Sequence, residues 1–123
     1  MVEINFSKSS TTNIILTPNG VNLAISVHDF GELIGGYWIE GIYILLFDHN
    51  AGKNIKNISA FQSNGSVIWS LSPPKIGSGA PSPWSSIGID QIKNRLFLQD
   101  FYGWGYVLEN PFTPELGPKV FMK

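Results

Sequence analysis

The chain has 123 residues, no cysteine and a formal net charge of −1. This length predicts a single domain, residues 1–123, that buries its own core, and the lack of cysteine excludes disulfides, thiolate metal sites and a cysteine nucleophile. Charged residues make up only 14% of the chain, against about 25% in an average soluble protein, and no basic run is present, so we expect no binding to nucleic acid.

The first residues, Met1-Val2-Glu3-Ile4-Asn5-Phe6, lack the basic segment followed by an apolar run that marks a secretory signal. The longest apolar run, Ile42 to Phe47, is far shorter than the roughly 20 residues of a transmembrane helix. We therefore expect a cytoplasmic protein that does not enter a membrane.

Apolar residues recur with a period of two in the first half of the chain. In Val21 to His28 the apolar side chains alternate with Asn, Ala, Ser and His, which predicts a half-buried strand. The β-branched run at 13–17 precedes it, and Pro18-Asn19-Gly20 between them is typical of a tight turn. The two segments are predicted to form a hairpin.

The next segments are less regular. Glu32 to Glu40 contains Gly35-Gly36, which argues against a stable helix. The run Ile42 to Phe47 is apolar on both faces and predicts a strand that is covered on both sides. The second cover is expected to be another sheet layer or a second copy of the chain.

The middle of the chain predicts another hairpin followed by a long loop. Ile55 to Gln62 and Ser66 to Leu71 flank the turn Ser63-Asn64-Gly65, and Val67, Trp69 and Leu71 are expected to share one face of the return strand. The stretch Ser72 to Ser85 contains four prolines, which cannot donate the hydrogen bonds of a sheet interior. It is expected to be a loop that carries Trp84.

Further strands are expected near both ends of the chain. With those above they give an all-β domain of about nine short antiparallel strands in meanders, arranged as a sandwich or barrel, with no convincing helix. The segments are Val2–Phe6, Ile87–Asp90, Arg95–Phe101, Trp104–Glu109 and Pro118–Met122.

Two stretches resemble the blade hairpins of β-propellers of the pyrroloquinoline-quinone-dehydrogenase type. Ile58 to Trp69 reads as a strand, an Asn-Gly turn and a strand with Trp, and Ile87 to Leu116 reads similarly. Blade repeats of about 40 residues usually number four to eight, and this chain has room for at most three. The resemblance implies antiparallel meanders, and no cofactor site or enzymatic activity is carried over from it.

No catalytic centre is recognisable. His28-Asp29 and Asp48-His49 could form a metal or acid–base site, but antiparallel pairing of 21–28 with 42–48 would separate the histidines by roughly 20 Å at about 3.3 Å per residue. Asp90 and Asp100 could be paired glycosidase carboxylates, and are more simply strand-end and turn residues. We expect no cofactor and no metal.

Aromatic residues are the strongest indication of a contact surface, because they provide large contact area at low entropic cost. The alternative is ordinary packing in a β core. The candidate partner- or ligand-binding residues are Trp84, Tyr102, Trp104, Tyr106, Tyr37 and Trp38.

Low charge, the doubly apolar strand and the long loop favour a non-catalytic protein-interaction module. Such a module could form a homodimer or inhibit a protein partner, for example by neutralising a toxin. The alternative is a domain that binds carbohydrate or a small ligand through the Tyr102–Tyr106 aromatics with Asp100 and Asn110 nearby. A hydrolase is the third hypothesis, because only the His and Asp residues could supply its acid and base.

Overall fold

Strand β6 (Ile42–Phe47) lies at the centre of the molecule, and all 6 of its residues are buried. The structure is a computed structural model that describes residues 1–16, 22–50, 54–74, 82–92 and 94–121. The central sheet has the strand order β1-β5-β6-β7-β8. Its other strands are β1 (Val2–Glu3), β5 (Leu33–Ile39), β7 (Ile58–Gln62) and β8 (Val67–Leu71).

Two further sheets flank this one. The N-terminal sheet consists of β2 (Asn5–Lys8), β3 (Thr12–Leu16) and β4 (Asn22–Ser26). The C-terminal sheet runs in the order β12-β11-β10-β9, and β13 also pairs with β11. Its strands are β9 (Trp84–Asp90), β10 (Arg95–Asp100), β11 (Trp104–Asn110), β12 (Glu115–Leu116) and β13 (Val120–Phe121).

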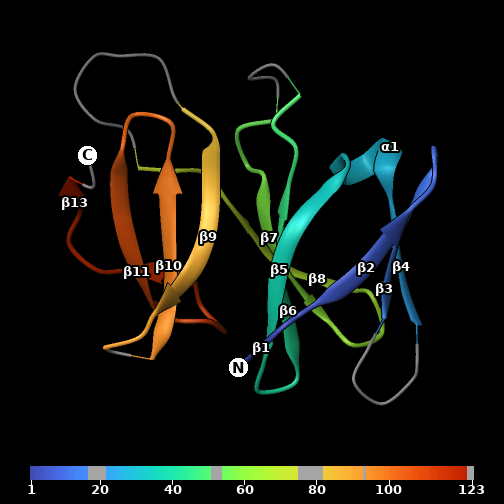
Figure 1. The fold of residues 1–123 in the computed structure, drawn as a ribbon, viewed down its shortest axis with the longest axis horizontal. Helices are drawn as coiled ribbons and strands as arrows, with labels where there is room; N and C mark the ends of the chain where they lie inside the picture. The colour runs from blue at the N-terminus through green and yellow to red at the C-terminus, as the bar shows by residue number, and fades with distance from the viewer. Residues whose placement is uncertain (17–21, 51–53, 75–81, 93, 122–123) are drawn as a thin grey trace.

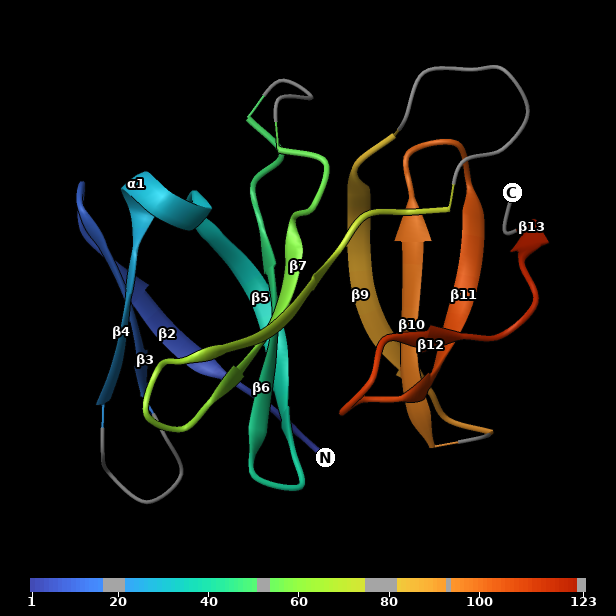
Figure 2. The same cartoon turned by 180° about the vertical axis from the view of Figure 1, so that it is seen from behind.

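The three sheets stack as layers, with the central sheet between the other two (Figures 1 and 2). Because successive side chains of a strand point to opposite faces, β6 contributes to two separate cores. Its even-numbered residues pack with the C-terminal sheet, in a core that includes Ile44, Leu46, Ile58, Leu96, Leu98, Tyr106 and Leu108. Its odd-numbered residues pack with the N-terminal sheet, in a core that includes Ile15, Leu23, Ile25, Tyr43, Leu45, Phe47 and Phe61.

The all-β class and the antiparallel meanders predicted from the sequence are confirmed. About nine strands were expected, whereas the structure has strands β1 to β13. Part of the difference is that β1, β12 and β13 are short strands of 2 residues each. The uncertain segment at 32–40 is strand β5. The two layers around β6 come from the same chain, so no second copy is required to cover it.

The N-terminal hairpin differs from the prediction at its ends. Strands β3 and β4 pair antiparallel as expected, whereas the turn Pro18-Asn19-Gly20 lies outside the described residues. The predicted strand to His28 ends at Ser26, because Ser26 caps the one-turn helix α1 (Val27–Phe30) by accepting a hydrogen bond from the Asp29 amide. His28 therefore lies on a helix instead of a strand.

The second hairpin contains a bulge that overturns one predicted face. Ala60 pairs with Trp69 and Phe61 with Val67, so Ile68 is the extra residue between them. Directly opposite residues share a face, which places Val67 on the face of Phe61 and not on that of Trp69. Trp69 and Leu71 remain together against the core shared with the C-terminal sheet.

Buried asparagines connect the layers. The Asn13 side chain donates to the carbonyl of Gly31 (2.8 Å) and accepts from the amide of Leu33 (2.9 Å). Asn57 joins the end of β6 to the start of β9 by donating to the carbonyls of Phe47 and Trp84, both at 2.9 Å, and accepting from the Trp84 amide at 2.9 Å. Both side chains satisfy backbone groups that no strand partner reaches.

The terminal strands pair within the chain. Strand β1 joins β5, β2 joins β3, and β13 joins β11. Within the part of the chain that the structure describes, no helix has the length and apolar character needed to cross a membrane.

Candidate functional site

The six aromatic candidates are divided between the core and separate surfaces. Trp84 was expected to lie in the long loop. It is instead the first residue of β9, where it pairs with Asp100. Its side chain is only 1% exposed. The indole Nε1 donates to the carbonyl of Leu71 (2.9 Å), and the ring meets Tyr106 edge-on with centroids 5.8 Å apart. Trp84 therefore fastens β9 to the central sheet.

Tyr106 is also a core residue, 3% exposed. Its hydroxyl is buried and has no hydrogen-bond partner among the described residues. Burial, and to a lesser extent the negative charge of Asp100, raise the pKa of the Tyr106 hydroxyl above its ordinary value. The unpartnered hydroxyl is a local cost to stability.

Tyr37 and Trp38 point to opposite faces of β5 and cannot act together. Tyr37 packs into the core shared with the C-terminal sheet, while Trp38 is half-buried against the core on the other side. Burial and then the negative charge of Glu3 raise the pKa of Tyr37.

The remaining two candidates flank the turn between β10 and β11. The buried Asp100 carboxylate accepts hydrogen bonds from the amides of Tyr102 (3.0 Å) and Trp104 (2.9 Å), which fixes the turn. Tyr102 is 53% exposed, whereas Trp104 is half-buried and Lys119 Nζ lies 4.6 Å from its ring centroid. The segment 102–106 therefore does not present its aromatic rings as one platform.

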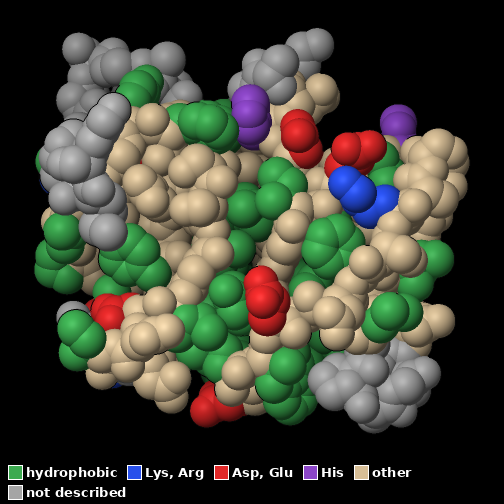
Figure 3. Space-filling model, viewed as in Figure 1, with side chains coloured by type: hydrophobic (Ala, Val, Ile, Leu, Met, Phe, Trp, Pro, Cys, Tyr) green, Lys and Arg blue, Asp and Glu red, His purple; other side chains and the backbone are tan. Residues whose placement is uncertain are grey.

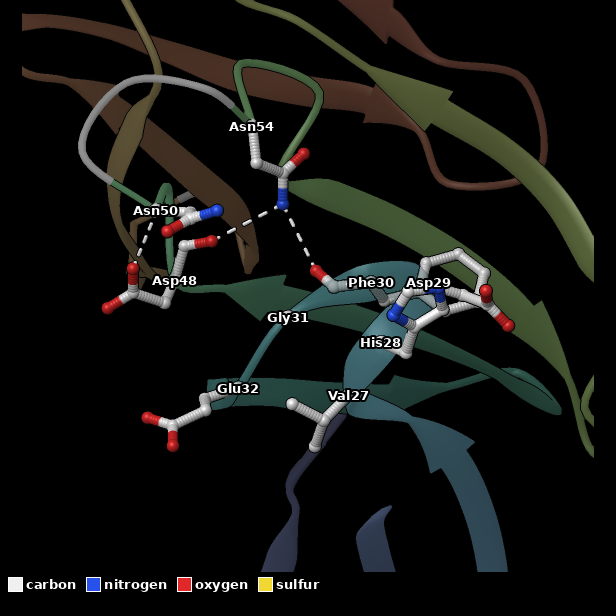
Figure 4. A pocket seen from close by; sticks show the side chains of 9 residues that line it. All are labelled: Val27, His28, Asp29, Phe30, Gly31, Glu32, Asp48, Asn50 and Asn54. Carbon is white, nitrogen blue, oxygen red and sulfur yellow. Dashed lines mark hydrogen bonds between the residues drawn. The ribbon is translucent and has the colours of Figure 1, made fainter. Parts of the chain in front are cut away.

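The structure corrects the expected placement of the first histidine. Strand β4 pairs with β3 and not with β6, since these strands belong to different sheets. As a result His28 on α1 and Asp48 after β6 line one polar pocket of about 500 Å³ (Figure 4). His49 turns elsewhere, with its ring 4.8 Å from that of Phe101.

Acidic side chains line the pocket of Figure 4, which is open to solvent. Asn54 organises its wall by donating to the carbonyls of Phe30 (3.1 Å) and Asp48 (3.3 Å). The carboxylate of Asp48 lies on the opposite side of the pocket from His28 and Asp29 (Figure 4). Nowhere among the described residues do three His, Asp or Glu side chains come together in a way that could hold a metal ion.

Asp90 and Asp100 are held apart by the hairpin that carries them. Asp90 pairs with Arg95 at one end of β10, and Asp100 is at the other end. Five residues of strand separate the two ends by about 17 Å, whereas paired glycosidase carboxylates lie within about 10 Å of each other. The two carboxylates therefore do not form such a pair.

An apolar groove on the outer face of the C-terminal sheet was missed from the sequence. It has a volume of about 460 Å³. Phe97 pairs with Gly88 on one side and Val107 on the other, and a Cβ atom at Gly88 would meet nothing within 4 Å. The lining residues are Ser86, Ile87, Gly88, Ile89, Asp90, Gln91, Ile92, Phe97 and Val120.

The groove lies along an open sheet edge. Strand β9 pairs with β10 and has no second strand partner within the described part of the chain. The bordering residues Ile92 and Val120 are 96% and 53% exposed. The available sequence signal was Ile92, an apolar residue in a turn that otherwise favours polar residues, together with the glycine between Ile87 and Ile89. The space-filling view shows apolar side chains exposed over this region of the molecule (Figure 3).

Similarity to known proteins gives no independent indication of function. The chain matches no protein-family model, and neither a curated protein nor a solved structure shows significant similarity to it. The features of the molecule that bear on its function are the groove, the unpaired edge of β9 and the distribution of exposed side chains.

Proposed function

We propose that the chain is a protein-interaction module that binds an extended segment of a protein partner along strand β9. In this mode of binding, the added strand makes backbone hydrogen bonds to an open sheet edge, and its alternate side chains enter neighbouring pockets. Strand β9 would supply the edge, and the groove beside Phe97 would supply the pocket. The observation that carries the proposal is the position of the groove directly along this edge.

The chemistry of the groove supports a protein segment with apolar side chains. Isolated apolar residues are normal on a protein surface, but here Ile92 and Val120 border one groove and are 96% and 53% exposed. The floor is open at Gly88, where a partner side chain could rest against the Phe97 ring. Covering such a surface removes apolar area from water, which favours binding.

The edge itself supports the same proposal. Edge strands are usually protected by shortness, by charged residues or by proline. Strand β1 has only 2 residues and β2 contains Lys8. Strand β9 has 7 residues, and Asp90 at its end is the one charged residue in it. Its edge opposite β10, which pairs with no other described strand, is therefore long enough to pair with several residues of a partner.

A peptide selection tests the proposal. A phage-displayed library of linear eight-residue peptides is selected on the immobilised chain, and the affinities of the selected peptides are measured by calorimetry. We expect peptides with apolar residues at alternate positions, and we expect Ile92→Lys to weaken their binding roughly tenfold, the effect of losing about 1.4 kcal/mol of contact. Ile92 is 96% exposed, so this substitution leaves the fold intact.

The matched control is Val67→Lys. Val67 is an exposed aliphatic residue on β8, which is also an edge strand, but it lies in the central sheet and outside the groove. This variant is expected to bind the selected peptides as the unmodified chain does. Equal affinity of the Ile92→Lys variant and the unmodified chain for every selected peptide would contradict the proposal.

A further inference from the structure

We infer that the partner segment carries an aromatic residue opposite Gly88 and a basic residue opposite Asp90, two positions earlier in its sequence. This inference rests on the proposed function and adds the chemistry of the segment that binds beside β9. In an antiparallel segment the pattern is basic, then aliphatic, then aromatic. The features behind it are the space above Gly88, a row of alternating charges that ends at Asp90, and the exposure of Ile89.

The space above Gly88 is open to a side chain from an added strand. Gly88 and Phe97 are register partners, so they share the outer face of the sheet. The Phe97 ring does not cover the glycine, since a Cβ atom at Gly88 would meet nothing within 4 Å. Both residues line the groove. A residue of an added strand opposite Gly88 would point its side chain onto the same outer face, directly beside this space.

The distance across the glycine favours an aromatic side chain. Neighbouring strands lie about 4.8 Å apart, so two spacings, roughly 9.6 Å, separate the Cα atom of the added residue from that of Phe97. A short side chain such as that of alanine does not bridge this distance. Two aromatic rings that lean towards each other over Gly88 can reach the centroid separation of about 4.5–7 Å at which aromatic pairs attract. Aromatic packing over a cross-strand glycine is also a known way to stabilise a sheet edge.

A row of alternating charges crosses the outer face at one end of the groove. Glu109 on β11 forms a salt bridge with Arg95 on β10, and Arg95 is the register partner of Asp90 on β9. The order across the sheet is therefore negative, positive, negative, and Asp90 is its last member at the edge. Opposite charges at directly opposite positions stabilise a sheet, and like charges destabilise it. A basic residue of the added strand would continue the alternation, whereas an acidic residue would face Asp90.

The orientation of the added strand sets the order of the pattern. Every strand pairing in the C-terminal sheet is antiparallel, and antiparallel pairing is slightly more stable per residue than parallel pairing. Asp90 follows Gly88 by two residues, so in an antiparallel partner the basic residue precedes the aromatic residue by two. The residue between them would lie beside Ile89, which is 39% exposed and points to the other face. An aliphatic residue there would form a cross-strand pair with Ile89.

A synthetic peptide tests this chemistry. The probe is Thr-Thr-Lys-Val-Phe-Val-Thr-Thr with blocked ends, and its affinity for the chain is measured by calorimetry. Replacing its Phe by Ala should weaken binding about tenfold. Replacing its Lys by Gln should weaken binding about threefold at low salt and have no effect in about 0.5 M sodium chloride. A peptide of the same composition with Lys and Phe exchanged should bind several-fold more weakly, because the order is reversed.

Two substitutions in the chain test the same contacts from the other side. Gly88→Val fills the space, so it should weaken the Phe peptide about tenfold and leave the Ala peptide unchanged. Gly35→Val is the matched control, because a Cβ atom at Gly35 also meets nothing within 4 Å but β5 lies in the central sheet. Asp90→Asn should abolish the preference for Lys over Gln, while its carboxamide oxygen can still accept the hydrogen bond from the Ile92 amide.

The inference is overturned if the Phe and Ala peptides bind equally, if Gly88→Val binds the Phe peptide as the Gly35→Val control does, or if exchanging Lys and Phe has no effect. The peptides selected from the library separate this failure from that of the proposed function. If selected peptides bind and Ile92→Lys weakens them, but the synthetic peptide does not bind, the interaction module stands with a segment of different chemistry. If Ile92→Lys has no effect on any peptide, both fail.

Discussion

Asn57→Ala tests how the layers are joined and how β9 is positioned. The side chain is 1% exposed and makes three hydrogen bonds to backbone groups, two with Trp84 and one with Phe47. A buried hydrogen bond contributes about 1 kcal/mol net, so the loss of three predicts a decrease of about 3 kcal/mol in the free energy of unfolding. With about 2.1 cal/mol/K of unfolding entropy per residue, this corresponds to a Tm about 12 °C lower.

The measurement is urea unfolding followed by tryptophan fluorescence. Asn64→Ala is the matched control. The side-chain oxygen of Asn64 also accepts two hydrogen bonds, from the amide and the hydroxyl of Ser66, but it lies at an exposed turn. Water can replace these bonds, so the control should lose less than about 1 kcal/mol. Equal losses in the two variants would refute the reasoning that burial makes the Asn57 contacts important.

The other predictions concern packing and buried hydroxyls. Gly36→Ala would bring its Cβ into a steric clash with the carbonyl oxygen of Ile44 and should destabilise the fold by about 1–3 kcal/mol. Gly35→Ala meets nothing within 4 Å and should be close to neutral in the same unfolding assay. Tyr106→Phe removes a buried hydroxyl without a described partner and should raise the unfolding free energy by about 1 kcal/mol; a decrease would argue against this. The raised pKa values of Tyr37 and Tyr106 mean that the folded state holds these protons more tightly than the unfolded state. The contribution that this difference in pKa makes to stability is complete below about pH 10 and is lost as the pH rises through the raised values. The unfolding free energy, measured across this pH range, should therefore fall less steeply in Tyr106→Phe than in the unmodified chain.

Much of the fold could be predicted because alternation is a local signal. The period of two predicted β4, the β-branched run before it predicted β3, and the uninterrupted apolar run predicted that β6 is a strand covered on both sides. Both inferences depend only on which face each side chain occupies. The run could not reveal whether the second cover came from the same chain, because that depends on contacts with strands distant in sequence.

The errors arose where long-range contacts decide the outcome. The pairing of β4 with β3 alone, and the separation of β4 and β6 into different sheets, brought His28 to the same end of the molecule as Asp48. Trp84 follows a proline-rich stretch, but its indole finds an acceptor in Leu71 and is buried. The bulge at Ile68 reversed the face of Val67, which a strict alternation could not anticipate.

The candidate site was missed for a related reason. The sequence predicts a contact surface of aromatic residues, yet Trp84, Tyr106 and Tyr37 are buried and contribute to one core. The groove arises because Gly88 lies beside Phe97 in the sheet, and this juxtaposition requires the register of β9 and β10. The residues that border it, such as Ile92, are conspicuous only when the turn that carries them is known.

The double covering of β6 also limits what association at β9 can do. Both faces of the central strand are buried by sheets of the same chain, so the cores of one copy are complete without another. An obligate dimer would have a folding stability that depends on protein concentration, whereas this chain should unfold at the same midpoint when it is diluted. A partner bound at β9 would therefore join a domain that is already folded, which is the behaviour expected of an interaction surface and not of a folding requirement.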